Sequence, residues 1–287
     1  MAVNLKAPPK SKGVLAKELG VSRATLYYKP KMPEKDLKFK AEIEQVMEKN
    51  KAYGHKRIAW HLEANKKKVL RVMKKFNLKP KRQRKAPKKP QDQNKVPMAV
   101  PNLIQGTIIE APSVVWACDF TYLPYFNRFY YLATVEDLFT REIVGWELFS
   151  KHNADLVVRA LSNGLRCYQA PQIAHSDQGS EYRSHKYQAL LLTQGIKQSM
   201  SDKASPWQNG CQEAFYSEFK LELGHPECYP TLAELIEAVA CQIYYYNNER
   251  LHTALKCPPA VFAARFKARR IFNNNLTFQE IAEVQSV

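Results

Sequence analysis

The fold of this chain is decided by residues 114–149, VVWACDFTYLPYFNRFYYLATVEDLFTREIVGWELF. Three runs rich in β-branched and aromatic residues, at 114–123, 129–137 and 142–149, are separated by short breaks and predict three strands. The first break, FNR at 126–128, suits a hairpin turn. We therefore expect an antiparallel arrangement here, because strands joined by short turns run in opposite directions.

The residues that follow alternate between helix and strand patterns. We expect a helix at 153–168, a strand at 172–177, a helix at 184–193, a strand at 195–201 and a helix at 207–223. Asn153 can cap the first of these helices, and Thr231 with Glu234 makes a capping-box pattern that opens a last long helix. The order predicts a mixed α/β sheet of five strands with flanking helices, its first three strands antiparallel and its later two parallel. This is the element order of the RNase H-like fold.

Two helical patterns precede the sheet. Residues 14–29 have the spacing of a helix–turn–helix with Gly20 at the turn and Ser22 as a cap, or of an ordinary amphipathic helix pair. Residues 36–77 contain three short helical patterns, and Asn65 can cap the third. We therefore expect small all-helical units in front of the sheet.

Positive charge is concentrated in the first third of the chain. The whole chain has a net charge of +17. Residues 1–100 hold 28 Lys and Arg and 8 Asp and Glu, a net charge of +20, whereas residues 101–287 hold 16 and 19, a net charge of −3. A segment this basic binds polyanions, and the usual polyanion inside a cell is nucleic acid. The alternative is a solvated basic tail with no specific partner.

The third helical pattern of residues 36–77 carries a dense row of basic side chains. Such a helix can lie along a DNA groove while its lysines neutralise phosphates, although a charged face that only keeps the helix soluble has the same composition. Residues 79–101, rich in Lys, Arg and Pro, predict an extended linker. The candidate DNA contacts in the N-terminal part are Arg23, Lys66, Lys67, Arg71, Lys74 and Lys75.

Three acids fall where this fold would place a metal site. Asp119 lies in the first strand, Asp177 ends the fourth strand, and Glu213 lies in the helix after the fifth strand. The first and fourth strands are neighbours in this topology, so their carboxylates can converge, and the last helix can bring the third. Hard oxygen ligands of this kind suit Mg²⁺, and a pair of such ions about 3.5–4 Å apart catalyses displacement at phosphorus.

The spacing along the last helix agrees with this arrangement. Lys220 comes seven residues after Glu213, nearly two helical turns, so the two side chains share a face. Cys211, Phe215 and Phe219 form a different stripe, which we assign to the core. Glu213 and Lys220 are therefore expected to point away from the core, towards a site.

Taken together, several motifs resemble the D,D(35)E transposases and retroviral integrases, and more narrowly the second-frame (OrfB) transposases of the IS-three family of insertion sequences. The resemblance covers most of the chain. Its segments are YGHKRIAWHLEANKKKVLRVMKKFNL (53–78), WACDFTYL (116–123), VEDLFTREIVGWEL (135–148), HSDQGSEY (175–182), SMSDKASPWQNGCQEAFYSEFK (199–220) and YYYNNERLHTALKCPPAVF (244–262). The absence of a His-His-Cys-Cys module in residues 1–110 argues against the retroviral branch.

The resemblance assigns roles to individual residues. It makes Asp119, Asp177 and Glu213 the catalytic acids that hold two Mg²⁺ ions, for which Mn²⁺ can substitute. It makes Lys220 a contact to the DNA end, and it places Asn209 at a helix entry where the residue touches the substrate. These roles belong to the family pattern and are carried onto the matching positions of this sequence.

The chain also departs from the family pattern beside the acids. Gln178 stands where arginine is frequent, Gly210 where alanine is common, and SPWQ at 205–208 replaces a more polar run. None of these changes removes a metal ligand, but they affect the neighbouring contacts. His175 is either a hydrogen-bonding partner of a metal ligand or a simple strand-end residue.

The activity implied by the resemblance is DNA transposition. Hydrolysis of a phosphodiester at the transposon end would free a 3′-hydroxyl, which would then attack a second phosphodiester with no covalent protein intermediate. The family also implies joining of the two ends in a circle, later insertion into target DNA, and a homo-oligomer, at least a dimer, on double-stranded DNA. A protein from the upstream frame (OrfA) is a possible partner. Two alternatives stay open: a nuclease or resolvase of the same fold that does not join, and a non-catalytic DNA-binding protein derived from a transposase.

The sequence further predicts five parts and a location. The parts are a partial helix–turn–helix segment at 1–35, a helical DNA-binding domain at 36–78, a basic linker at 79–110, a catalytic core at 111–225 and a C-terminal helical segment at 226–287. No apolar run approaches the roughly 20 residues of a membrane span, and the N-terminus lacks a secretory pattern, so we expect a cytoplasmic protein without a membrane partner. The resemblance to insertion-sequence transposases further implies a bacterial, nucleoid-associated protein. Six scattered cysteines without a CxxC pair predict buried, reduced thiols.

Overall fold

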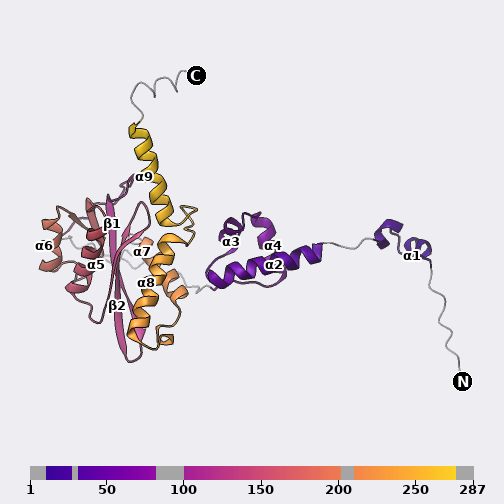
Figure 1. The fold of residues 1–287 in the computed structure, drawn as a ribbon, viewed down its shortest axis with the longest axis horizontal. Coiled ribbons are helices and arrows are strands. Elements are labelled where there is room, and N and C mark those ends of the chain that lie inside the picture. The colour runs from indigo at the N-terminus through magenta and orange to yellow at the C-terminus, as the bar shows by residue number, and fades with distance from the viewer. Residues whose placement is uncertain (1–10, 28–31, 82–99, 202–209, 276–287) are drawn as a thin grey trace, which may run out of the picture.

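A five-stranded sheet forms the centre of the larger, C-terminal body of the molecule (Figure 1). The computed structural model describes residues 11–27, 32–81, 100–201 and 210–275. Its strands are β1 (Val115–Tyr125), β2 (Arg128–Asp137), β3 (Ile143–Phe149), β4 (Ile173–Ser176) and β5 (Lys197–Met200). They lie in the order β3-β2-β1-β4-β5, with β1 antiparallel to β2 and parallel to β4. The expected RNase H-like sheet is confirmed.

The long hairpin of β1 and β2 sets the faces of the sheet. Its two-residue turn begins with Phe126, which has a φ of +48°, because the turns that match the twist of a hairpin need positive φ values. The register places Asp119 opposite Thr134. Side chains alternate between the two faces along each strand, so directly opposed residues share a face. Asp119 and Thr134 therefore project from the same side.

Helices cover both faces of the sheet (Figure 1). On one side, α5 (Ala154–Cys167) and α6 (His185–Thr193) pack on a cluster that contains the buried Trp116 of β1. On the other side, α7 (Gly210–Leu223) and α8 (Leu232–Asn248) pack on a cluster that contains Leu123 and Leu132. A short 3-10 helix, η3 (Pro226–Cys228), separates α7 from α8, and α9 (Pro259–Asn275) follows.

The expected helix caps form. The Asn153 side chain accepts from the backbone N–H of Leu156 at the start of α5, and Thr231 accepts from the N–H of Glu234 at the start of α8. Each of these bonds satisfies a donor that the first turn of a helix leaves open. Helix α7 is described from Gly210 onwards, so the first residues of its expected range lie outside the described part.

The N-terminal part is helical. Its elements are α1 (Lys12–Glu18), the 3-10 helix η1 (Arg23–Tyr27), α2 (Met32–Lys49), α3 (His55–His61) and α4 (Lys66–Lys75). Gly20 has a φ of +63° at the turn after α1, and Ser22 accepts from the N–H of Thr25 in η1. Asn65 caps α4 by accepting from the N–H of Lys67 at 2.8 Å. We call α2, α3 and α4 the helical unit.

The helical unit is docked on the α7–α8 side of the sheet (Figure 1). The backbone N–H of Leu251 donates to the Tyr53 hydroxyl at 2.8 Å, and the Leu251 side chain packs against the apolar cluster of the helical unit. Lys49 forms an ion pair of 2.7 Å with Glu249. Segments almost two hundred residues apart in the sequence thus share one interface.

The cysteines differ from the expectation. All six are free, and Cys118 and Cys257 are buried, but Cys167, Cys228 and Cys241 are exposed. The last three lie on helices or near helix ends, where a small side chain fits the solvent side as well as the core, so sequence alone did not separate them. Within the described residues, no helix combines the length and hydropathy that a membrane crossing requires.

Candidate active site

Asp119 is the most buried of the three candidate acids. It lies in β1 on the face covered by α7, and its Oδ1 accepts from the backbone N–H of Phe120 at 2.8 Å. The pKa of Asp119 is raised to about 7: burial is the largest cause, the charges of Asp177 and Glu213 also raise it, and the hydrogen bond from Phe120 opposes them. The other two acids therefore lie close enough to Asp119 to repel its negative charge.

Asp177 follows directly on the last residue of β4. The parallel register places His175 beside Ala117, so the end of β4 lies next to the part of β1 that carries Asp119. Asp177 is exposed, and its Oδ1 accepts from the N–H of Gly179 at 3.0 Å. This bond closes a tight turn that holds the carboxylate at the C-terminal end of β4.

Glu213 is exposed in the first turn of α7, and its two neighbours on that helix fix it against β1. The buried Gln212 side chain donates to the carbonyl of Ala117 at 2.8 Å. The Tyr216 hydroxyl donates to the carbonyl of Asp119 at 2.7 Å. Residues on either side of Glu213 are thus bonded to the strand that carries the first acid.

Thr134 completes this network from β2. Its hydroxyl donates to Gln212 Oε1 at 2.8 Å and lies 2.7 Å from the Tyr216 hydroxyl. Sequence analysis did not identify these residues as functional. The available signal was weak: a threonine within an apolar strand, and two polar side chains four residues apart on a helix.

The three acids are neighbours, but they do not form a closed ligand group. Among the residues that the structure describes, no set of three His, Cys, Asp or Glu side chains converges closely enough to hold a metal ion. The electrostatic coupling at Asp119 is the structural sign of their proximity. A cluster of carboxylates with that coupling is the arrangement a divalent cation would neutralise.

His175 is neutral and turned towards β5. It is fully buried, its Nδ1 lies 2.9 Å from the Ser199 hydroxyl, and its Nε2 has no hydrogen-bond partner within the described part of the chain. Burial lowers the pKa of His175 to about 4. A bond from His175 to one of the acids, which the sequence left open, is not present among these contacts.

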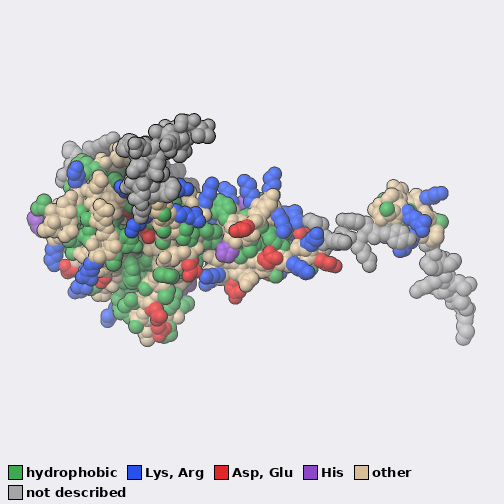
Figure 2. Space-filling view, turned by 45° about the horizontal axis from the view of Figure 1, so that its top comes forward, with side chains coloured by type: hydrophobic (Ala, Val, Ile, Leu, Met, Phe, Trp, Pro, Cys, Tyr) green, Lys and Arg blue, Asp and Glu red, His purple; other side chains and the backbone are tan. Residues whose placement is uncertain are grey.

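The expected DNA contacts fall into distinct groups. Lys220 is half-buried on α7, with its Nζ 4.6 Å from the ring centre of Tyr122, and Asn209 lies outside the described residues. Arg71 and Lys75 form ion pairs of 2.6 and 2.8 Å with the buried Asp36, so part of their role is inside the helical unit. All six N-terminal candidates are exposed, and Arg23, Lys66, Lys67 and Lys74 are the ones without an ion pair to Asp36. Figure 2 shows Lys and Arg side chains gathered over the helical unit.

A second polar network holds the middle of α7. Arg250 is 1% exposed and donates to Glu218 and, at 3.0 Å, to Glu222. Arg57 of α3 donates to the same Glu218 at 3.2 Å and to the hydroxyl of Thr253 at 3.0 Å. Burial lowers the pKa of Arg250 to about 9, and the charge of Arg57 lowers it too. The helix that carries Glu213 is thereby tied both to the C-terminal segment and to the helical unit.

Comparison with known proteins gives a consistent set of relatives. The sequence profile of the integrase core domain matches residues 110–206, and a second integrase core domain profile matches residues 194–259. The transposase for insertion sequence element IS904 of Lactococcus lactis is 38% identical over 159 residues, which are 54% of this chain and 63% of that protein. The putative transposase InsK for insertion sequence element IS150 of Escherichia coli is 31% identical over 253 residues, 82% of this chain and 87% of that protein.

Solved structures of integrases are also similar, at lower identity. The HTLV-2 integrase catalytic core domain, solved in complex with magnesium, has a TM-score of 0.42 and 18% identity over 53% of this chain and 97% of its own. A chain of the simian T-cell lymphotropic virus intasome has a TM-score of 0.49 and 16% identity over 74% of this chain and 70% of its own.

Proposed function

This chain belongs to the IS-three family of insertion-sequence transposases, which carry an integrase core domain, and we propose that Asp119, Asp177 and Glu213 are the acids with which it cleaves and joins DNA. The observation that supports this assignment is the electrostatic coupling of the three acids. Burial and the charges of Asp177 and Glu213 raise the pKa of Asp119 to about 7, so the carboxylates are close although they come from β1, the end of β4 and α7. Like charges that are brought together from distant parts of a chain are more frequent at functional sites than elsewhere in a protein.

The three acids fit divalent cations. Carboxylate oxygens are the ligands that Mg²⁺ prefers, and Mn²⁺ accepts the same set. A cation would also remove the repulsion that raises the pKa of Asp119. We propose that the trio holds two Mg²⁺ ions, which when bound would favour the attacking oxygen and stabilise the leaving oxygen at phosphorus.

The reaction consists of two displacements at phosphorus. In the first, a water oxygen bonds to a phosphorus at the transposon end, the bond from that phosphorus to the 3′-oxygen breaks, and the 3′-oxygen leaves as a hydroxyl. In the second, this 3′-oxygen bonds to another phosphorus and displaces the 3′-oxygen already there. The number of phosphodiester bonds is conserved in the second step, so joining needs no energy-rich cofactor.

The protein's contribution is to hold the acids in place. Asp119 is fixed by the sheet and by the N–H of Phe120, Asp177 by the N–H of Gly179. Glu213 is positioned through its neighbours Gln212 and Tyr216. Pre-organised charges of this kind need no rearrangement during the reaction, which is where most of their catalytic effect arises.

The remaining parts would bind and organise DNA. We propose that Arg23, Lys66, Lys67 and Lys74 neutralise phosphates of double-stranded DNA, that Lys220 contacts the transposon end, and that Asn209 touches the substrate. The active form would be a homo-oligomer, at least a dimer, holding both ends, with a protein of the upstream frame as a possible partner. It would work in the bacterial cytoplasm, on nucleoid DNA.

Substitution of one exposed acid tests the assignment. Asp177→Asn keeps the size of the side chain and removes its charge, so cleavage of DNA carrying the chain's own flanking sequence should be abolished while DNA binding is nearly unchanged. Asp155→Asn is the matched control, because Asp155 is half-buried on α5 and its carboxylate pairs with Lys186 of α6 at 2.8 Å, on the side of the sheet away from α7. Full cleavage by Asp177→Asn in Mg²⁺ would remove Asp177 from the site.

A further inference from the structure

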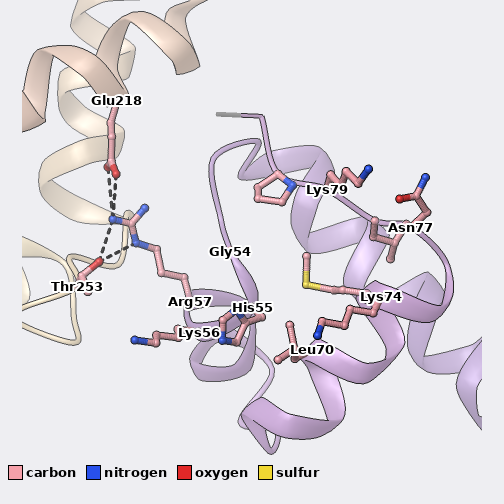
Figure 3. A pocket seen from close by; sticks show the side chains of 13 residues that line it. Gly54, His55, Lys56, Arg57, Leu70, Lys74, Asn77, Lys79, Glu218 and Thr253 are labelled. Carbon is pink, nitrogen blue, oxygen red and sulfur yellow. Dashed lines mark hydrogen bonds and ion pairs between the residues drawn. The ribbon is translucent and has the colours of Figure 1, made fainter. Parts of the chain in front are cut away.

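A hollow lies between the helical unit and the core (Figure 3). It has a volume of about 710 Å³, and its walls come from α3, α4 and the segment after α4 on one side, and from Glu218 and Thr253 on the other. Arg57 reaches across to both of these core residues and so holds the two walls together. We call this space the interdomain cleft.

The interdomain cleft carries positive charge that the protein does not neutralise. Lys56, Lys74 and Lys79 line it, all three are exposed, and none forms an ion pair with a residue in the described part of the chain. The carboxylate among its lining residues, Glu218, is already bonded to Arg57 and Arg250. The three lysines therefore line a space whose only carboxylate among the described lining residues is already bonded to two arginines.

The lysines at the cleft differ from their neighbours on α4. Arg71 and Lys75 are bonded to Asp36, which neutralises them inside the helical unit. Lys74 lies between them in the same stretch of helix but lines the cleft (Figure 3). The basic side chains of α4 thus fall into two groups. Arg71 and Lys75 are bonded to Asp36, and Lys74 is available to a ligand.

Between the lysines the lining is mostly apolar, with His55 and Asn77 among its other members. Leu70, Met73, Leu78 and Pro80 contribute to it, and Met73 is buried in the cluster of the helical unit. A cationic rim over an apolar floor matches a nucleic-acid strand, whose phosphates are anionic and whose sugars and base faces are largely apolar. A space of this volume encloses a drug-sized molecule, about the size of one or two nucleotides, and is too small for a whole duplex to enter.

We propose that the interdomain cleft binds the sugar–phosphate backbone of DNA, with Lys56, Lys74 and Lys79 at the phosphates and the apolar floor against the sugar. Two sources offer this chemistry: an unpaired strand, which can enter, and the exposed edge of a duplex, which can lie across the rim. The site adds Lys56 and Lys79 to the DNA contacts expected from the sequence. It also places DNA beside α7, because Glu218 in the cleft wall is five residues after Glu213.

The proposal rests on the proposed function only in taking DNA as the polyanion. Its test is binding by the full chain without Mg²⁺, so strand cleavage does not enter. The variant Lys56→Gln/Lys74→Gln/Lys79→Gln removes the three charges and keeps side-chain length. The matched control Lys151→Gln/Lys197→Gln/Lys267→Gln removes three exposed charges from the core and α9. All six positions are exposed, so both variants should unfold at the temperature of the unaltered chain.

The affinity of each protein is measured by fluorescence anisotropy for a short single strand and for the matching duplex over a range of salt concentrations. Each lost phosphate contact reduces the slope of log affinity against log salt by about 0.7 for a single strand, so the cleft variant should lose about 2 from that slope and bind about tenfold more weakly. The control variant should match the unaltered chain. Because the slope counts ionic contacts, a merely structural effect would leave it unchanged.

The two DNA forms identify the source. If the cleft variant loses affinity for the single strand alone, the cleft binds unpaired DNA. If it loses more affinity for the duplex, and its salt slope falls by about 2.7, the cleft binds a duplex edge. Equal slopes for cleft and control variants on both forms overturn the proposal. That result leaves the function of the acids intact, whereas normal cleavage by Asp177→Asn together with a flattened slope for the cleft variant would overturn the acids and keep the cleft.

Discussion

The core and the helical unit hold uncompensated charges of opposite sign, in surroundings that differ. In the core, Asp119 is half-buried in a central strand, and its pKa is raised by desolvation and by the charges of Asp177 and Glu213. In the helical unit, Lys56 and Lys74 stand on exposed helix faces without an ion pair among the described residues. A metal ion demands ligand positions within tenths of an ångström, so the acids proposed to hold one need a rigid sheet and helix behind them, whereas phosphates are attracted over several ångströms and can be bound by exposed lysines.

The two regions meet at one carboxylate. Glu218 accepts from Arg250, which is 1% exposed, and from Arg57 of the helical unit. The first contact lies within the core and the second crosses between the regions. Removing one guanidinium at a time therefore tests whether the core is stable by itself and whether the helical unit is only attached to it.

The largest effect is expected at Arg250. Arg250→Met removes the buried partner of Glu218 and leaves Glu222, which keeps only the hydrogen bond from Gln242, without an ion pair; breaking a buried ion pair in this way destabilises a protein by about 3–5 kcal/mol. The free energy of unfolding, measured by urea titration with tryptophan fluorescence, should fall by that amount. DNA affinity at a temperature where the variant is folded should stay close to that of the unaltered chain.

Arg57→Met is the matched variant at the interface. Arg57 bonds the same carboxylate but is more accessible, and Glu218 keeps Arg250, so its loss should lower the unfolding free energy by about 1–2 kcal/mol. If both variants lose equal stability, the core does not stand alone and the two regions unfold as one unit. The view that the core is stable by itself and the helical unit is only attached to it would then be wrong.

The second effect concerns the network behind Glu213. Tyr216→Phe removes the hydroxyl that donates to the carbonyl of Asp119 and contacts Thr134. A small displacement of one acid relative to another slows such chemistry strongly, so single-turnover cleavage should be about 10- to 100-fold slower. DNA affinity should not change, because the hydroxyl is buried and cannot reach DNA.

A tyrosine on the neighbouring helix provides the control for this variant. Tyr244→Phe removes a hydroxyl from α8 at a residue that is 63% exposed, and its cleavage rate should equal that of the unaltered chain. A loss of affinity in Tyr216→Phe, with the cleavage rate of bound DNA unchanged, would show that the network supports binding and does not position Glu213.

The places of the three candidate acids in the fold could be predicted better than the contacts around them. Asp119, Asp177 and Glu213 could be placed because each falls at a defined point of a recognisable strand or helix. The caps at Asn153 and Thr231 were predictable because they depend on bonds between residues three apart in the sequence. Local chemistry of this kind is written in short stretches of sequence.

The missed contacts are all long-range. Gln212 bonds Ala117, which is 95 residues away, and the N–H of Leu251 bonds Tyr53, which is 198 residues away. Nothing in either short segment indicates its partner, because pairing is decided by how helices dock on the sheet. For the same reason the division of the basic row on α4 could not be predicted, since Asp36 lies 35 residues before Arg71.

Two buried carboxylates give the regions opposite pH dependence. In the core, burial raises the pKa of Glu136 to about 8 against the opposing charge of Arg141, and its Oε2 has no partner among the described residues. The folded state holds this proton more tightly than the unfolded state, so the contribution to stability is lost as pH rises from about 4 towards 8. Glu136→Gln should flatten the dependence of unfolding free energy on pH in that window.

Asp36 in the helical unit is the counterpart. Hydrogen bonds from Arg71 and Lys75 hold the pKa of Asp36 well below its ordinary value. Its contribution is therefore present above about pH 4 and is lost as the pH falls further, and Asp36→Asn should remove that acid-side loss. If Glu136→Gln changed stability only below pH 4, the assignment of an unpaired carboxylate to the core would fail.

The smallest effect is expected at the turn that holds Asp177. A β-carbon built on Gly179 would lie 3.0 Å from Asp177 Oδ1 and 3.1 Å from Glu181 Oε2, so Gly179→Ala has to push one carboxylate aside. Asp177 is exposed and can give way, which predicts a cleavage rate lower by about three- to tenfold and a stability change below about 1 kcal/mol. Gly13→Ala is the control, because no atom lies within 4 Å of its added carbon. An unchanged rate in Gly179→Ala would mean that cleavage does not depend on the exact position of Asp177. Precise positioning of charge would then no longer distinguish the acids of the core from the exposed lysines of the helical unit.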